Sequence, residues 1–162
     1  MMRRNKDGKY FERIQAAPLP ISFVIKRRVR LSEVDVMGIV WYGRYPLYFE
    51  DASQELGRRC GLSYQDFYAA NIRAPIAQFH VDYYQSLYLD EEFTVKATMP
   101  WCEGAKLLSE YEIRKADGAL VTAAYTVQMF TDSYTGEILV ATPEFLAGVR
   151  SRWLAGEFSC LK

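Results

Sequence analysis

The sequence predicts a single α+β domain in which one amphipathic helix packs against an antiparallel sheet. Between residues 45 and 60 apolar side chains recur at helical spacing, whereas from residue 74 onward they alternate with polar ones. Several segments of the alternating kind follow one another, separated by short turn sequences, which is typical of an antiparallel meander. A helix followed by such a meander favours a two-layer α+β arrangement.

Composition narrows the class of protein. Half of the 162 residues are apolar, so the chain can bury the core of one domain. Twenty Lys and Arg residues balance twenty Asp and Glu residues, which argues against a nucleic-acid partner. The three cysteines are far apart and form no C-x-x-C pair, and no apolar run has the length of a membrane span or signal peptide. We expect a cytoplasmic protein with reduced thiols, no metal site and no membrane contact.

The chain divides into three expected parts. Residues 1–20 mix charges with prolines and show no sustained period, which predicts a flexible arm, with a docking helix over residues 9–15 as the alternative. Residues 21–155 form the domain, and residues 156–162 form a C-terminal tail. There is no internal repeat or linker that would indicate a second domain.

The first elements of the domain are a strand and two helices. Residues 22–31 alternate apolar and basic side chains, which predicts a half-exposed strand; its basic run is interpreted as a solvated face, with contact to a cofactor phosphate as the alternative. A helix is expected from Tyr45, with Pro46 in its first turn and Gly61 as C-cap. A shorter helix over residues 62–71 follows. The apolar stripe of the first helix consists of Tyr45, Tyr48, Phe49, Ala52, Leu56 and Cys60.

Strands and one more helix complete the prediction. The Asp117-Gly118 pair is the clearest hairpin signal among the turns. After Pro143, apolar residues return to helical spacing, which predicts a C-terminal helix. The expected strands span residues 75–84, 91–99, 106–115, 120–132 and, as a short final strand, 137–141.

Few residues can carry chemistry. The chain contains no G-x-S-x-G, P-loop or G-x-G-x-x-G motif, so common serine-hydrolase and nucleotide-binding folds are excluded. Its one histidine, His80, lies in the middle of an expected strand and is interpreted as structural. Cys60 lies on the apolar stripe of the helix with no neighbour that would lower its pKa, so a nucleophilic thiol is not expected.

Asp35 is the carboxylate that remains. It precedes the apolar segment from Met37 to Tyr42, which could desolvate it, and a helix start whose free N–H groups could stabilise developing negative charge. These are the components needed for acyl transfer. An aspartate in a loop before a helix is also commonly a cap or turn residue, and the residues alone leave both interpretations open.

The segment from Asp35 to Gly61 reads D-V-M-G-I-V-W-Y-G-R-Y-P-L-Y-F-E-D-A-S-Q-E-L-G-R-R-C-G. It closely resembles the signature of the 4-hydroxybenzoyl-CoA thioesterase-like branch of the hotdog-fold acyl-CoA thioesterases. In that family an Asp, a short spacer, G-[IV]-V-[YW] and an aromatic residue lead into an acidic helix. The resemblance continues more weakly through residues 79–83, 89–91 and 132–136, and covers roughly residues 23–145.

The resemblance implies a hotdog fold, in which a curved antiparallel β-sheet wraps a long central helix, and an active site at the interface of a homodimer or homotetramer. Asp35 would be catalytic, as nucleophile or as general base. The substrate would be an acyl-CoA, with no cofactor besides the CoA that it carries. Backbone N–H groups near Tyr42, Arg73 and Ala74 would hold the oxyanion. The residues expected to contact substrate are Gly38, by close backbone approach, together with Trp41, Tyr42, Tyr45 and Glu50.

Two departures from the family pattern bear on the substrate. Thioesterases of short aliphatic acyl-CoAs commonly have a histidine where Trp41-Tyr42-Gly43 stands in this sequence. Its absence here favours a pocket for aromatic acyl groups. The arginine-rich turn that holds CoA phosphates is replaced by residues 101–106, where Lys106 alone remains as a phosphate contact. The alternatives are therefore an acyl-carrier-protein thioesterase, a non-catalytic acyl-thioester binding module, and a hotdog dehydratase, for which His80 is wrongly placed.

Overall fold

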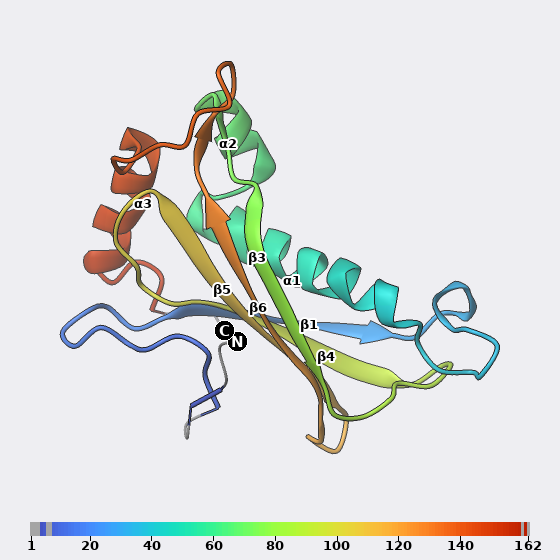
Figure 1. Ribbon diagram of the computed structural model, residues 1–162. Helices are drawn as coiled ribbons and strands as arrows, with labels where there is room; N and C mark the ends of the chain where they lie inside the picture. Colours follow the sequence, from blue (N-terminus) through green and yellow to red (C-terminus); the bar gives the residue numbers. More distant parts are fainter. Residues whose placement is uncertain (1–3, 6–7, 160, 162) are drawn as a thin grey trace.

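The computed structural model describes residues 4–5, 8–159 and 161. Its centre is a five-stranded antiparallel sheet with the strand order β1-β4-β5-β6-β3, and the long helix α1 crosses one face of it (Figure 1). This is the hotdog arrangement that the resemblance implied. The strands of the sheet are β1 (Ile21–Arg28), β3 (Ile76–Tyr83), β4 (Glu92–Met99), β5 (Lys106–Lys115) and β6 (Leu120–Met129).

Smaller elements surround this core. A two-stranded ribbon pairs β2 (Ile72–Arg73) with β7 (Thr131–Asp132). The helices are α1 (Tyr45–Cys60), α2 (Tyr64–Ala69) and α3 (Glu144–Leu154), and two 3-10 turns, η1 (Leu31–Glu33) and η2 (Tyr42–Arg44), precede α1.

Helix α1 forms as its sequence predicts. Pro46 stands in its first turn, and Gly61 ends it in the left-handed region at φ 78°. Every member of the expected apolar stripe is buried against the sheet. Gly57 belongs to the same face, and a Cβ there would lie only 2.5 Å from the Leu62 carbonyl oxygen, so the chain can turn back toward α2 only over a glycine. On the sheet side, Phe49 stacks on the Tyr111 ring at 5.0 Å.

The expected strand over residues 137–141 is wrong. Only Ile138 forms a bridge, to Thr131. The cause is the turn at Asp132, whose Oδ1 accepts the N–H groups of Tyr134 and Thr135, both at 2.8 Å. The chain therefore reverses after only two residues of β7, which leaves too short a partner for a longer ladder. The expected strand over residues 120–132 is likewise divided between β6 and β7 at Phe130.

Tyr10 and Phe11 of the N-terminal segment pack on the outer face of the sheet, opposite α1. Tyr10 and Phe11 are 6% and 7% exposed and contact Tyr125. No helix forms over residues 9–15. The buried Glu110 carboxylate holds the segment: Oε1 accepts the N–H groups of Tyr10 at 2.8 Å and Phe11 at 2.9 Å, and Oε2 accepts Arg13 Nη2 at 2.5 Å.

Glu110→Gln tests how firmly this segment is held. We expect the free energy of unfolding to fall by about 1–3 kcal/mol, because the neutral amide weakens two charge-assisted hydrogen bonds and leaves the partly buried Arg13 guanidinium without its counter-charge. Urea denaturation measures the change. Glu112→Gln is the matched control, since Glu112 lies two residues away on β5 and pairs with Arg4 and Arg114 in a more exposed position. Equal stability of the two variants would contradict a special role for Glu110.

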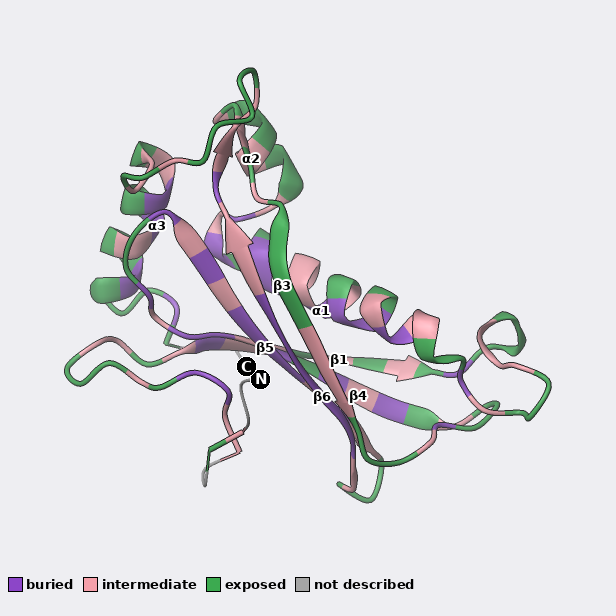
Figure 2. Cartoon of the chain, viewed as in Figure 1, coloured by how far each residue is buried: buried purple, intermediate pink, exposed green. Residues whose placement is uncertain are grey.

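The C-terminal end also packs on the domain. Phe158 is buried beside α3, and Trp153 Nε1 donates to Leu19 O at 2.8 Å, which ties α3 to the segment that precedes β1. The most exposed part of the sheet is β3, the edge strand beside β6, much of which is green in Figure 2. This edge lies next to the site described below.

Candidate active site

Asp35 opens a tight turn between Val34 and Val40, which form a bridge. Its N–H donates to Ile39 O at 2.9 Å, and its Oδ1 accepts the Met37 N–H at 2.8 Å. One carboxylate oxygen thus holds the turn, as the alternative interpretation of this residue expected. The other oxygen, Oδ2, makes no hydrogen bond to any residue that the structure describes, so it is available to a ligand.

Gly38 serves this turn through its conformation. Its φ is +74°, a left-handed value that favours glycine, and its N–H donates to Asp35 O at 3.0 Å. A Cβ at Gly38 would meet nothing within 4 Å. Within the protomer, therefore, glycine is required for the turn and not for the close approach of another backbone.

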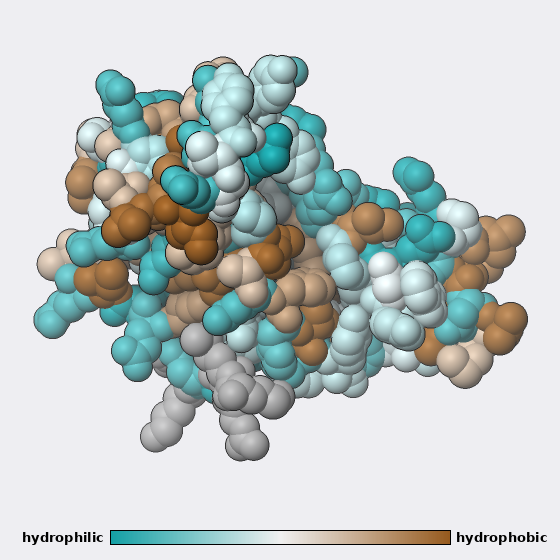
Figure 3. Space-filling view, turned by 45° about the horizontal axis from the view of Figure 1, so that its top comes forward, coloured by the Kyte–Doolittle hydropathy of each residue, from teal (hydrophilic) through white to brown (hydrophobic). Residues whose placement is uncertain are grey.

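The apolar wall beside Asp35 is exposed in the single chain. Val36 is fully exposed, and Trp41 and Tyr42 are 46% and 68% exposed. Figure 3 shows brown side chains at the projecting end of the molecule, where this loop lies. An apolar surface of this kind on a folded chain is typical of an interface. Asp35 is only partly buried, so the desolvation expected from the wall requires another molecule to cover it.

Tyr45 and Glu50 lie further along α1 in different environments. Tyr45 is buried against Tyr48 and Tyr83, at ring distances of 5.9 and 5.1 Å, and burial raises its pKa to about 12. It is therefore part of the core at the edge of β3. Glu50 is exposed, and its Oε1 accepts Tyr64 OH at 3.0 Å and Gln54 Nε2 at 3.1 Å.

The oxyanion candidates lie at opposite ends of β3. Tyr42 is next to the end of that strand, since its carbonyl oxygen accepts Tyr83 OH at 3.2 Å. Arg73 and Ala74 precede its start, where Ala74 O accepts Gln128 Nε2 at 2.9 Å. Eight residues of strand separate the two places by about 26 Å. A single protomer does not bring these groups together.

Lys106 is on the Ala74 side of the molecule. It begins β5 and pairs with Met129, whose N–H donates to Pro75 O at 3.1 Å. The basic run on β1 is neutralised in part by ion pairs: Arg27 contacts Glu33 and Asp51, and Arg28 contacts Asp90 and Glu92.

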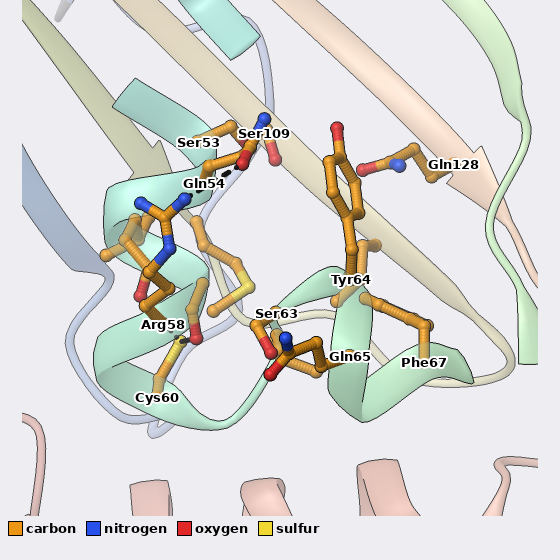
Figure 4. A pocket seen from close by; sticks show the side chains of 15 residues that line it. Ser53, Gln54, Arg58, Cys60, Ser63, Tyr64, Gln65, Phe67, Ser109 and Gln128 are labelled. Atoms are coloured by element: carbon orange, nitrogen blue, oxygen red, sulfur yellow. Dashed lines mark hydrogen bonds between the residues drawn. The ribbon is translucent and has the colours of Figure 1, made fainter. Parts of the chain in front are cut away.

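A cavity of about 390 Å³ lies between the C-terminal half of α1, helix α2 and strands β4 to β6 (Figure 4). It is at the far end of α1 from Asp35. Leu56, Met99 and Leu107 supply apolar surface, and Ser53, Ser109 and Gln128 add polar groups. None of these polar residues is among the site residues expected from the sequence. The sequence does contain one indication of a polar group in the core. Ser109 is a polar residue at an inward position of β5, between the buried Leu107 and Tyr111.

Two other groups lie apart from Asp35. His80 is on the outer face of the sheet, stacked on Tyr125 and 3.0 Å from Asp82 Oδ1 through Nε2. Cys60 is buried at the end of α1, where its Sγ donates to Leu56 O at 3.1 Å.

The buried thiols should resist modification. Burial raises the pKa of Cys60 to about 12 and also raises the pKa of Cys102, so at pH 8 the thiolate that reacts with alkylating reagents is scarce. We expect iodoacetamide to modify these two cysteines in urea but not in buffer, as read by peptide mass spectrometry. Rapid modification of Cys60 or Cys102 in the folded protein would contradict this expectation.

Two features are absent from the described residues. No helix there is long and apolar enough to cross a membrane. No group of three or more His, Cys, Asp and Glu residues in that part of the chain is arranged to hold a metal ion.

Comparison with known proteins agrees with this architecture. Residues 29–150 match the thioesterase-like superfamily. A putative esterase from Aquifex aeolicus (strain VF5) is 28% identical over 101 residues, which are 62% of this chain and 79% of that protein. The acyl-CoA thioester hydrolase YbgC from Escherichia coli O157:H7 is 24% identical over 105 residues, which are 65% of this chain and 78% of that protein.

Solved structures show the same fold. A DHNA-CoA thioesterase from Staphylococcus aureus superposes with a TM-score of 0.71 and 25% identity, over 84% of this chain and 95% of that one. The family match over residues 29–150 includes Asp35 and the whole of α1. By its sequence match over most of its length and by its hotdog fold, the chain belongs to the thioesterase-like superfamily.

Proposed function

We propose that this chain hydrolyses an acyl-CoA thioester to the free acid and CoA, with Asp35 as the reacting carboxylate and a homodimer as the functional unit. Membership of the superfamily and similarity to proteins named as acyl-CoA and DHNA-CoA thioesterases support the reaction. One observation carries the proposal of a dimeric site. The loop that bears Asp35 and the cavity that can hold an acyl group lie at opposite ends of α1, so a second protomer is needed to bring a carboxylate to each cavity.

Antiparallel pairing of two β3 edges would bring these parts together. Tyr45 contacts Tyr83 near the end of β3, and Phe49 contacts Phe79 near its middle, so α1 and β3 run in opposite directions along the edge. A two-fold axis through that edge places the end of one β3 beside the start of the other. The Asp35 loop of one protomer then reaches the cavity end of its partner, and β3 gains the neighbour it lacks.

The same pairing assembles an oxyanion site. The N–H near Tyr42 of one protomer would approach the segment of the partner's Arg73 and the partner's Ala74, two places that lie far apart in one chain. Trp41 and Tyr42 would be covered by the partner, which removes water from the neighbourhood of Asp35 and strengthens its electrostatic interactions.

The chemistry at Asp35 can take two balanced forms. As general base, Oδ2 takes a proton from water while the water oxygen attacks the thioester carbon; the C–S bond breaks and the proton passes to the CoA sulfur. As nucleophile, Oδ2 attacks that carbon itself, CoA leaves, and water hydrolyses the resulting anhydride. Water that attacks the Asp35 carbonyl of this anhydride leaves its oxygen in Asp35, so ¹⁸O recovered in Asp35 after a single turnover in ¹⁸O-water would show the nucleophilic route. Neither form requires a cofactor.

The carrier of the acyl group is open to a direct test. Lys106 lies on the cavity side of the protomer, where CoA phosphates could reach it, but an acyl-carrier protein is the alternative.

We place the enzyme in the cytoplasm, since Cys60 and Cys102 are free thiols suited to a reducing compartment.

The proposal is tested by release of free thiol from aliphatic and aromatic acyl-CoAs and from the corresponding acyl-carrier proteins. We expect turnover of acyl-CoA. Turnover only of the carrier-protein substrates would change the carrier and keep the reaction. If the wild-type protein binds these thioesters but hydrolyses none of them, it is a binding module and the proposed activity is wrong.

A further inference from the structure

We propose that Glu33 is a positioning residue for the reaction: it holds the Asp35 carboxylate at a fixed place relative to the backbone N–H near Tyr42. This inference rests on the proposed function, because it takes Asp35 as the reacting group and that N–H as an oxyanion donor. It goes beyond the proposed function by assigning a role to a buried ion pair that lies outside the reacting groups.

The backbone attaches both groups to Glu33. Asp35 follows Glu33 by two residues, and a bridge between the two sides of the loop closes the turn that carries it. On the other side of this turn the Trp41 N–H donates to Glu33 O at 3.0 Å, and Tyr42 is the next residue. A shift of Glu33 therefore displaces the carboxylate and the oxyanion donor at the base of the loop that bears them.

The Glu33 side chain is held by sheltered contacts. It is only 12% exposed, although the tip of the loop is open to solvent. Its Oε2 accepts the Arg30 N–H at 2.8 Å, and its Oε1 pairs with Arg27 Nη2 at 3.3 Å. Burial raises the pKa of Tyr48, and the neighbouring Glu33 carboxylate raises it further. A carboxylate shielded in this way keeps its position, because separating it from its partners would leave a charge uncompensated.

Arg27 connects Glu33 to the rest of the fold. Its guanidinium also pairs with Asp51 on α1 and lies over the Tyr48 ring, 5.2 Å from the ring centroid. Arg27 itself belongs to β1, which pairs with β4 along its whole length. One guanidinium thus joins the sheet, the central helix and Glu33. Figure 1 shows the loop projecting beyond the end of β1, away from the body of the sheet, so its geometry depends on an anchor at its base.

The expected consequence is an effect on rate with little effect on binding. A displacement of about 1 Å between reacting groups can lower a rate by about 100-fold. Glu33 does not line the cavity and takes no part in the sheet ladders, and Arg27 keeps Asp51 as a counter-charge when Glu33 is removed. Loss of the Glu33 side chain should therefore spare the fold and the place of the acyl group while productive geometry becomes rare.

Kinetics of matched variants test this inference. Glu33→Ala should lower kcat by about 10- to 100-fold with KM within about 3-fold of wild type. Glu33→Gln keeps one acceptor oxygen at the same reach and should recover part of the rate. Adding Arg27→Met to Glu33→Ala should lower kcat little further, as expected of residues that act as a unit. Glu92→Ala is the control: it removes an ion pair with Arg28, the next residue on β1, and should keep wild-type kcat.

Hydrogen exchange reads the geometry without turnover. In the wild-type protein the Asp35 N–H donates to Ile39 O and the Trp41 N–H donates to Glu33 O. In Glu33→Ala these two amides should exchange at least about 5-fold faster, as measured by NMR, while the amides of β5 keep their protection. Glu92→Ala should leave the loop amides unchanged.

The outcomes separate this inference from the proposed function. Wild-type kcat in Glu33→Ala, or an equal fall in Glu92→Ala, would overturn the inference and leave the proposed function in place. A lower kcat without faster exchange would also overturn it, since the lost charge and not the position would then be responsible. If Glu33→Ala does not fold, Glu33→Gln and Glu92→Gln carry the same comparisons. Absence of thioester hydrolysis by the wild-type protein, together with the expected change in exchange, would overturn the proposed function alone.

Discussion

Asp35→Asn should lower kcat for acyl-CoA hydrolysis by about 10²- to 10⁴-fold, the range typical of losing a general base or carboxylate nucleophile. The amide is a poor proton acceptor and a poor nucleophile, but its oxygen can still accept the Met37 N–H that shapes the turn. Structure and substrate binding should therefore survive. Initial rates of free-thiol release, with KM and the melting temperature of the same preparation, measure the effect.

The chain offers a matched control for this change. Asp117 also opens a turn, and its Oδ1 accepts the Ala119 N–H at 2.9 Å, but it lies in the β5–β6 hairpin, in neither part of the proposed site. Asp117→Asn makes the same chemical change to the same kind of turn and should retain wild-type kcat. Full activity in a folded Asp35→Asn variant would show that another group carries the reaction.

Val81→Pro should convert the dimer into monomers and abolish most of the activity with it. The Tyr84 N–H donates to Val121 O on β6, so by strand alternation the Val81 N–H points away from β6 toward the free edge of β3. Proline there removes a donor from the proposed β3–β3 pairing while sparing the ladder within the protomer. Sedimentation velocity and hydrolysis rates measured on the same sample test both consequences.

Val81→Ala separates pairing from packing. It shortens a side chain that packs partly on the core but keeps the backbone N–H, so it should remain dimeric and active with some loss of stability. A fully active, monomeric Val81→Pro protein would contradict a site shared between protomers.

Mixing two inactive variants tests that sharing directly. Ser53→Trp fills the cavity and Asp35→Asn removes the carboxylate, so a mixed dimer holds one site with Asp35 from one subunit and an open cavity from the other. Random exchange should restore about a quarter of wild-type activity, because half of the dimers are mixed and each has one intact site. No restoration after verified exchange would place both parts of the site in one protomer.

Local sequence determined the elements of this protein. The period of the apolar residues placed α1 at Tyr45–Cys60 and β5 at Lys106–Lys115, since both signals depend only on which face of an element is buried. The long motif from Asp35 to Gly61 indicated the family. Where the sequence analysis failed, as at residues 137–141, the deciding factor was a partner: β7 is too short to pair with a longer strand.

The candidate active site is likewise determined in part by local sequence and in part by tertiary contacts. The sequence by itself determined the Asp35 turn, the helix beside it and the thioesterase-like family, because short-range geometry and a contiguous motif encode them. Only the tertiary structure decided that Glu110 holds the N-terminal segment, that Ser53, Ser109 and Gln128 meet around one cavity, and that this cavity lies at the opposite end of α1 from Asp35. Such contacts join residues far apart in the chain, and no local pattern specifies which distant side chains a fold will bring together.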